Sequence, residues 1–203
     1  MKQQRNRPLN QNKRKAILKA AIEEFYTKGY EGSSMDNISK EANVSKATVY
    51  NHFKSKEELF FAIAMIIKER LKASFAYVYN TKPIETQLHE IATQEMQFLN
   101  NTENIRLIQI ITIVMIQKNA IGQKLREIKK DDAMEMTVKW FEDAKRDGKL
   151  QYEDTLFVAK QFIGMIKSFA FHPQLYGAAL LNQEEQKKVI EQSVTMIIKL
   201  YKK

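Results

Sequence analysis

Residues 33–60 contain two short segments whose apolar residues recur at helical spacing, with a polar turn between the two segments. This pattern constrains the fold more than any other part of the chain. Asn43 falls where the chain must turn sharply, and asparagine tolerates the left-handed backbone conformation that ends a helix. Ser45 follows as an N-cap whose hydroxyl can accept a free backbone N–H of the next helix. The stretch therefore predicts a helix-turn-helix and the start of a supporting helix, held together by Ile38, Ala42, Val44, Val49 and Phe53.

The second helix of this pair carries a polar outward face. Lys46, Thr48, Tyr50, Asn51 and His52 are donors or short polar groups, which suit phosphates and base edges in a major groove. The alternative is that they are ordinary exposed polar residues of an all-α bundle. The basic residues that precede the pair favour a DNA-binding interpretation.

The stretch GYEGSSMDNISKEANVSKATVYNHFKSKEELF resembles the N-terminal domain of the TetR family of bacterial transcriptional regulators. The resemblance covers roughly residues 13–60, and QFIGMIKSFAFHPQLYG (161–177) is similar to a C-terminal segment of some members. Asn43 departs from the glycine that members usually carry, but it keeps a residue that tolerates positive φ. The elements that match are Gly29-Tyr30, Ser33-Ser34, Ile38, Ala42, Val44-Ser45, Thr48, Tyr50, His52-Phe53, Lys56 and Leu59-Phe60.

The resemblance implies a homodimeric transcriptional regulator, most often a repressor, that binds a palindromic DNA operator. In such a protein Thr48, Tyr50 and His52 would bond phosphates, while Lys46, Ala47 and Asn51 would lie nearest to base edges. Lys56 and Ser34 stand at helix starts, where free N–H groups and the helix dipole favour a phosphate. The complete expected set of DNA contacts is Ser34, Ser45, Lys46, Ala47, Thr48, Tyr50, Asn51, His52 and Lys56.

The formal net charge of +9 is concentrated near the N-terminus. Residues 1–19 contain no acidic residue, and we expect residues 1–12 to form a disordered basic arm that contacts DNA phosphates. The alternative is a tail that only aids solubility. The basic residues within 1–19 are Lys2, Arg5, Arg7, Lys13, Arg14, Lys15 and Lys19.

Several classes of protein are disfavoured by what the sequence lacks. There is no cysteine, the three histidines are scattered, and no common catalytic motif is present, so we expect no enzyme, metal site or cofactor. The first 20 residues lack an apolar signal region, and the apolar stretch 105–116 is too short and too polar to span a bilayer. We therefore expect a cytoplasmic protein with no membrane partner.

Six glycines and three prolines in 203 residues, with many strong helix formers, predict an all-α fold. We expect a three-helix DNA-binding domain at residues 13–60 and a helical bundle for effector binding and dimerisation at 61–203. The expected helices, about nine, span residues 13–28, 35–42, 46–52, 55–79, 83–99, 104–117, 121–147, 153–171 and 182–201.

The second domain carries many methionines and aromatic residues, whose default role is the core. In TetR-like proteins this domain usually encloses a small-molecule pocket, and uncharged polar groups among the apolar ones would orient a mostly apolar effector. The residues expected to line such a pocket are Met96, Gln109, Thr112, Trp140, Gln161, Phe162, Met165 and Phe169.

The last two helices are the expected dimer interface, although their apolar stripes could equally pack within the chain. A homodimer is also favoured because a single helix-turn-helix buries little area and gains by contacting both halves of a palindrome. The expected interface residues are Phe157, Gly164, Ser168, Val189, Ser193, Met196, Ile197 and Leu200. The remaining alternatives are an effector-independent DNA-binding protein and an enzyme or carrier built on the bundle.

Overall fold

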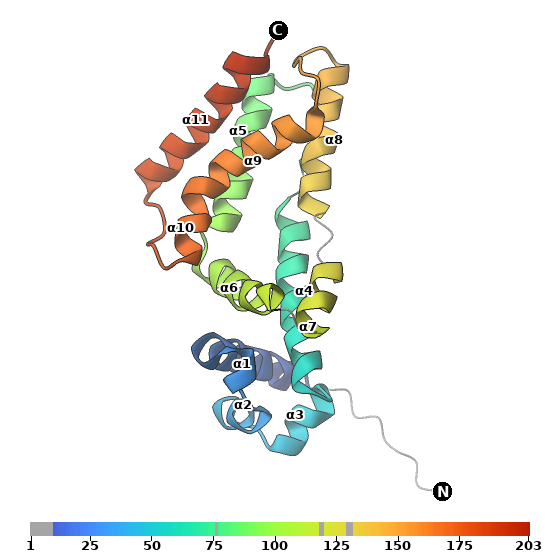
Figure 1. Cartoon of the computed structure of the whole chain (residues 1–203), viewed down its shortest axis with the longest axis vertical. Helices are drawn as coiled ribbons and strands as arrows, with labels where there is room; N and C mark the ends of the chain where they lie inside the picture. The colour runs from blue at the N-terminus through green and yellow to red at the C-terminus, as the bar shows by residue number, and fades with distance from the viewer. Residues whose placement is uncertain (1–9, 76, 118–119, 129–131) are drawn as a thin grey trace, which may run out of the picture. The chain divides into compact units, whose positions relative to one another are not determined.

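The computed structural model describes residues 10–75, 77–117, 120–128 and 132–203, so most of the predicted basic arm lies outside the described residues. The described ranges form only helices, apart from one isolated bridge between Leu150 and Lys202. Figure 1 shows their order: α1 (Gln11–Gly32), α2 (Met35–Glu41), α3 (Lys46–His52), α4 (Lys56–Ser74), α5 (Ile84–Leu99), α6 (Thr102–Ile116), α7 (Ala120–Ile128), α8 (Asp132–Arg146), α9 (Thr155–Ala170), α10 (His172–Leu175) and α11 (Gln183–Tyr201). The predicted all-α class is confirmed.

The described helices number eleven where about nine were expected, for two reasons. The predicted helix 121–147 is two helices, α7 and α8, and residues 129–131 between them lie outside the described residues. The short α10 follows Phe171 and has Pro173 in its first turn, where a missing N–H costs nothing.

The helix predicted to run from residue 55 to 79 ends at Ser74, so its predicted C-terminus is wrong. Phe75 and Tyr77 are buried after the helix ends. Asn80 then closes a turn, since its Oδ1 accepts from the Lys82 N–H at 2.9 Å and its Nδ2 donates to the Val78 carbonyl at 3.1 Å. This local hydrogen bonding competes with continued helix.

The chain divides into two compact units. The first comprises residues up to Ile66 together with Gln109–Glu127, and the second comprises Ile67–Ile108 and Ile128–Lys203. Helices α4 and α6 therefore each contribute to both units. The functional division at residue 60, between DNA binding and effector binding, remains a prediction.

In the first unit α1 packs on α2 and α2 packs on α3. Regular helical geometry in α1 breaks at Gly29, whose φ of 69° favours glycine. Phe25, Tyr30 and Phe60 form an aromatic cluster, with ring centroids 5.1 to 5.8 Å apart. Because Phe60 belongs to α4, this cluster joins the start of α4 to the end of α1.

In the second unit α9 and α11 lie side by side and both pack on α5, while α8 packs on α9. Trp140, Phe141 and Phe162 are fully buried in its core. The predicted start of the last helix is confirmed, because Asn182 and Glu185 form a capping box. Among the described residues no single helix is long and apolar enough to cross a membrane, although the bent pair α6 and Ala120–Glu127 passes such a test by length and composition.

Candidate DNA-binding surface

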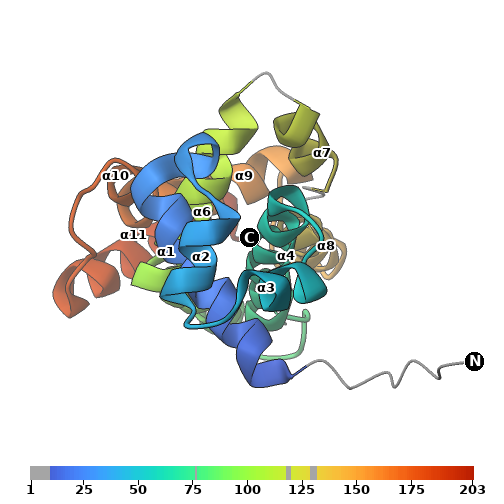
Figure 2. The same cartoon turned by 90° about the horizontal axis from the view of Figure 1, so that it is seen from below.

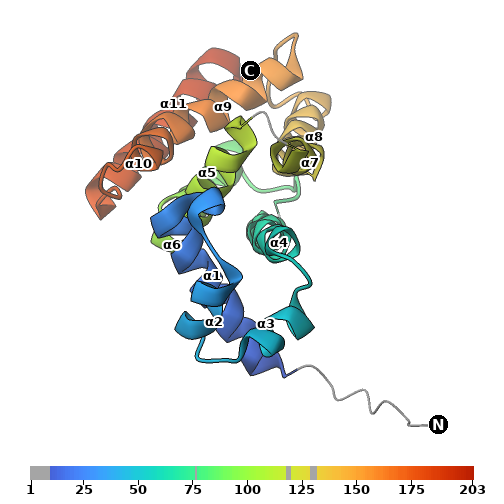
Figure 3. The ribbon, with the colours of Figure 1, turned by 60° about the horizontal axis from the view of Figure 1, so that its bottom comes forward.

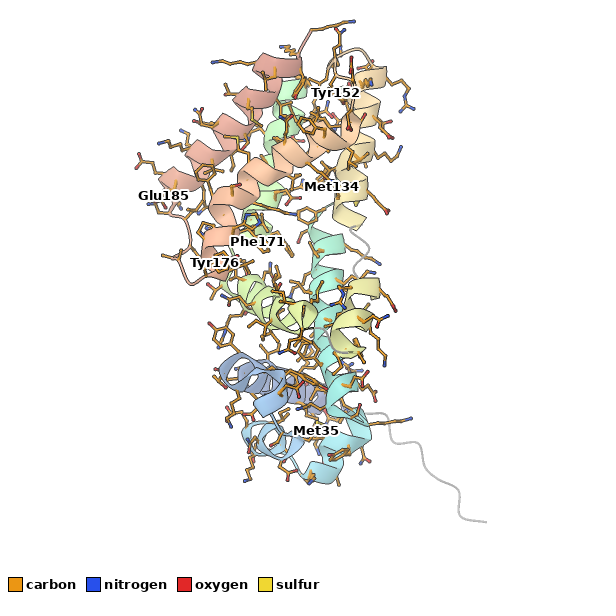
Figure 4. All side chains as sticks on the ribbon, viewed as in Figure 1. Met35, Met134, Tyr152, Phe171, Tyr176 and Glu185 are labelled. Atoms are coloured by element: carbon orange, nitrogen blue, oxygen red, sulfur yellow. The ribbon has the colours of Figure 1, made fainter. Side chains whose placement is uncertain are left out.

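Helix α3 presents one face to the core and one to the outside. Val49 and the following Phe53 are buried, whereas Lys46, Ala47 and Asn51 are exposed and Tyr50 is 42% exposed. Ser45 caps the helix as predicted, since its Oγ accepts from the Thr48 N–H at 3.1 Å and lies 2.9 Å from the Thr48 hydroxyl. Figures 2 and 3 show α3 beside α2 and the first turns of α4. Of the predicted polar face, Lys46, Tyr50 and Asn51 are thus exposed, and Thr48 and His52 are half-buried.

The turn between α2 and α3 has the predicted geometry. Asn43 has a φ of 51° and is the one non-glycine residue with positive φ in the described ranges. Its N–H donates to the Lys40 carbonyl at 3.1 Å, and the Val44 N–H donates to the Ser39 carbonyl at 3.0 Å. These two bonds satisfy carbonyls at the end of α2 and fix the direction of α3.

Lys46 is engaged by an acidic residue of α2. Its Nζ lies 2.6 Å from Oδ1 of Asp36, and both side chains are more than half exposed. The hydrogen bond and the charge of Asp36 raise the pKa of Lys46. The Asp36 carboxylate therefore competes with any other anion for the Lys46 ammonium group, and the sequence pattern did not indicate this pair.

His52 lies at the end of α3 and is half-buried, and its Nδ1 has no hydrogen-bond partner within the described ranges. Burial lowers its pKa, and the charges of Arg14 and Lys13 lower it further. The Arg14 guanidinium also lies 4.9 Å from the centroid of the Phe53 ring. The first turn of α1 therefore places two cations near the end of α3. The sequence showed that residues 13–19 are basic, but not that they lie beside α3.

Ser34 caps α2, accepting from the Asn37 N–H at 3.1 Å. Its own N–H donates to Oε1 of Glu24 at 3.4 Å, and that oxygen also accepts from Nδ2 of Asn37 at 2.8 Å and from Lys28 at 3.3 Å. Burial alone would raise the pKa of Glu24, but these hydrogen bonds and the charge of Lys28 lower it. A carboxylate of the chain itself thus occupies the start of α2, which sequence reasoning missed.

Lys56 does not project from the first turn of α4 toward solvent as expected for a phosphate contact. Its Nζ donates to three backbone carbonyls, those of Tyr30 at 2.6 Å, Ser33 at 3.0 Å and Glu31 at 3.4 Å. It also lies 4.4 Å from the centroid of the Tyr30 ring. In this conformation the ammonium group is committed to the turn between α1 and α2.

The expected effector-binding residues differ in burial and are divided between the two units. Met96, Trp140 and Phe162 are buried, Met165 is half-buried and Phe169 is 50% exposed. The Gln161 side chain accepts from the Tyr201 hydroxyl at 2.6 Å, at the contact between α9 and α11. The remaining two, Gln109 and Thr112, are half-buried residues of α6 in the first unit.

The second unit contains a buried polar group that sequence reasoning did not select. The Tyr77 hydroxyl lies 3.3 Å from Oε1 of Glu95 and 2.9 Å from Oγ1 of Thr137, and all three residues are buried. The residue before Glu95 is Gln94, whose Oε1 is buried and has no hydrogen-bond partner within the described part of the chain. No group of three or more metal-ligating side chains occurs among the described residues.

Three of the expected dimer residues are core residues of the single chain. Val189, Ser193 and Ile197 are at most 8% exposed, because this face of α11 packs on α5 and α9. Their assignment to a surface is therefore wrong. The others remain accessible: Phe157, Ser168 and Leu200 are exposed, while Gly164 and Met196 are half-buried.

Two family models together match most of the chain. One, described as bacterial regulatory proteins of the tetR family, matches residues 17–63, and another, described as the C-terminal domain of AefR-like transcriptional repressors, matches residues 86–203. The chain belongs to the TetR family of helix-turn-helix transcriptional regulators. The resemblance stated from sequence is confirmed.

Individual relatives agree with this assignment. A TetR-family transcriptional regulator from Pseudomonas syringae pv. tomato str. DC3000 has a similar crystal structure, with a TM-score of 0.77, 35% identity, and 93% of this chain and 96% of that one covered. The regulator YhgD of Bacillus subtilis is 32% identical over 110 residues, 54% of each chain. IcaR of Staphylococcus epidermidis, a negative regulator of the biofilm operon icaADBC, is 46% identical over 44 residues, 22% of this chain and 24% of IcaR. The match thus spans about half of YhgD and a quarter of IcaR.

Proposed function

We propose that this regulator represses transcription by binding a palindromic operator as a homodimer, and that a small, mostly apolar effector releases it from DNA. The observation that carries the proposal is the exposed polar face of α3, anchored by Val49 and flanked by cations of α1. Repression is supported by the description of the matching C-terminal family model and by the function named for IcaR. Such a protein acts where bacterial DNA is, in the cytoplasm.

The exposed residues of α3 are the proposed readers of the operator. Lys46, Ala47 and Asn51 would lie at base edges, while Thr48, Tyr50 and His52, with Ser34 and Ser45, would hold phosphates. Duplexes that tile the DNA flanking its own gene, compared with scrambled duplexes by fluorescence anisotropy, test this assignment. We expect the double variant Lys46→Ala/Tyr50→Ala to lose specific binding while it keeps its helical circular dichroism. Wild-type affinity in the folded double variant would refute the assignment.

The proposed dimer surface is the accessible face of α9 and α11. Two large apolar side chains of this packed helix pair are mostly exposed, since Phe157 of α9 is 57% and Leu200 of α11 is 61% exposed. Gly164 lies inside the continuous helix α9, although a glycine inside a helix costs about 1 kcal/mol relative to alanine. A methyl group at Gly164 would meet no atom within 4 Å, so packing within the chain does not explain the glycine. Close approach of a partner helix, also at Ser168 and Met196, does explain it.

The proposed effector site lies in the second unit. Tyr77, Glu95 and Thr137 supply polar atoms among buried apolar side chains, as expected where sparse polar anchors orient an apolar ligand. An effector releases DNA only if it binds the non-binding conformation more tightly, so operator DNA must weaken effector binding by the same factor. A thermal-shift screen of hydrophobic and amphipathic compounds, repeated with and without operator, tests this reciprocity.

A second candidate function is DNA binding without an effector. It is favoured by the tight aromatic packing of the second unit, where Trp140 and Phe162 both contact Phe141 at ring-centroid distances of 5.1 and 5.9 Å. The screen separates the two candidates, because no compound should shift both melting temperature and DNA affinity in an effector-independent protein.

A further inference from the structure

Within the first unit, the segment that carries the helix-turn-helix begins and ends at one place. It begins at the end of α1 and the turn that follows, and it ends at Lys56, in the first turn of α4. The hydrogen bonds from Lys56 to Tyr30 and Ser33 join residues 26 and 23 positions apart. A single ammonium group therefore connects the entry and the exit of the whole segment, including α2 and α3.

The ammonium group of Lys56 has no free donor in this arrangement. A lysine has three N–H donors, and three carbonyl oxygens lie within 3.4 Å of its Nζ. The ring face of Tyr30 covers it from another direction, and Tyr30 is itself buried against Phe25 and Phe60. The carbonyl groups of Tyr30 and Glu31 belong to the end of α1, where a cation also interacts favourably with the helix dipole.

The neighbouring residues make the start of α4 a poor phosphate site. Ser55 caps the helix, accepting from the Glu58 N–H at 3.1 Å, and the Glu58 carboxylate accepts from the Lys54 N–H at 2.9 Å. Glu57 is paired with Lys124 of α7 at 2.8 Å. The first turn thus carries two carboxylates and an already satisfied cap, both of which disfavour an added anion.

We propose that Lys56 is a positioning residue for DNA recognition, which closes the base of the helix-turn-helix and sets the orientation of α3 without touching DNA. Only Phe53, Lys54 and Ser55 connect α3 to α4, so the carbonyl contacts of Lys56 restrain the exit of α3, together with the buried Phe53 ring. Without these contacts α3 stays folded but can adopt several orientations. DNA binding must then fix one orientation, and the entropy lost in doing so weakens the affinity. This inference rests on the proposed DNA-binding function of α3.

The test compares Lys56→Gln with Lys46→Gln, because both remove one positive charge and only Lys46 belongs to the proposed DNA surface. Operator affinity is measured against salt concentration at a temperature where circular dichroism shows each variant fully folded. We expect Lys56→Gln to weaken binding about tenfold with an unchanged salt slope. Lys46→Gln removes a cation from the DNA surface and should lower the slope by at most about 0.9, the value for one neutralised phosphate. Lys56→Arg, which keeps donors for the carbonyls, should recover part of the affinity.

Two outcomes overturn the proposal. A salt slope that falls in Lys56→Gln as it does in Lys46→Gln makes Lys56 a phosphate ligand. Wild-type affinity in folded Lys56→Gln leaves Lys56 a stabilising residue only. Amide hydrogen exchange without DNA separates this test from the proposed function: we expect faster exchange in α2 and α3 of Lys56→Gln, and unchanged exchange refutes the positioning role even if no operator is found.

Discussion

Replacing Gly164 by alanine should have opposite effects on the single chain and on the dimer. In the single chain the added methyl group meets no atom within 4 Å, so only helix propensity changes. Alanine is favoured over glycine in a helix interior by about 1 kcal/mol, which we expect as added stability. In a dimer whose partner helix packs on Gly164, the same methyl group overpacks the contact, at a cost of about 1–3 kcal/mol. For a cost of about 2 kcal/mol, the middle of this range, the dimer dissociation constant rises roughly thirtyfold, since 1.4 kcal/mol is a factor of ten.

Two measurements separate these effects. Urea unfolding at concentrations far below the dissociation constant reports on the single chain, and sedimentation equilibrium reports on the dimer. Gly32→Ala is a matched control, because its methyl group would meet only Lys28 Cβ at an ordinary 3.6 Å and Gly32 lies in α1, away from the proposed interface. A Gly164→Ala protein that dimerises as tightly as wild type would refute the close approach of a partner helix at this residue.

Three further predictions follow from individual contacts. Asp36→Asn frees Lys46 from its 2.6 Å ion pair, so affinity for random DNA should rise severalfold at low salt in anisotropy titrations, and unchanged affinity contradicts this. The pKa of His52 is lowered in the folded chain, so as the pH drops the unfolded chain binds this proton first, and the unfolding free energy falls below a pH of about 6.5. In urea unfolding, His52→Gln should reduce this dependence of the unfolding free energy on pH. The same pH dependence as in the wild type would contradict the reasoning. Gln87→Leu removes the hydrogen bonds of this side chain to Asn80, to the Lys82 carbonyl and to Trp140 Nε1. We expect the unfolding free energy to fall by about 3 kcal/mol, and a fall below about 1 kcal/mol would contradict the reasoning.

The local elements of the fold could be predicted from the sequence because they depend on residues within four positions of one another. The cap of α3 at Ser45, the positive φ of Asn43 and the start of α11 at Asn182 all agree with the prediction. Each of them satisfies backbone groups with a side chain or turn close in sequence, so neighbouring residues alone decide it. The bounds of α3 were predicted for the same reason, and with them the choice of residues on its exposed face.

What only the tertiary structure decided are the contacts between elements. An apolar stripe on α11 shows that one face will be buried, but not whether its own chain or a partner buries it; Val189, Ser193 and Ile197 proved to pack within the chain. The position of Lys56 at the start of α4 predicts a phosphate contact, and only the folded chain shows its bonds to carbonyls 26 and 23 residues earlier. The hydrogen bond from the Ser34 N–H at the start of α2 to Glu24 of α1, and the ion pair between Asp36 and Lys46, were likewise not predicted. A charged side chain binds whichever partner the folded chain brings within about 3 Å, and spacing along the sequence does not determine that partner.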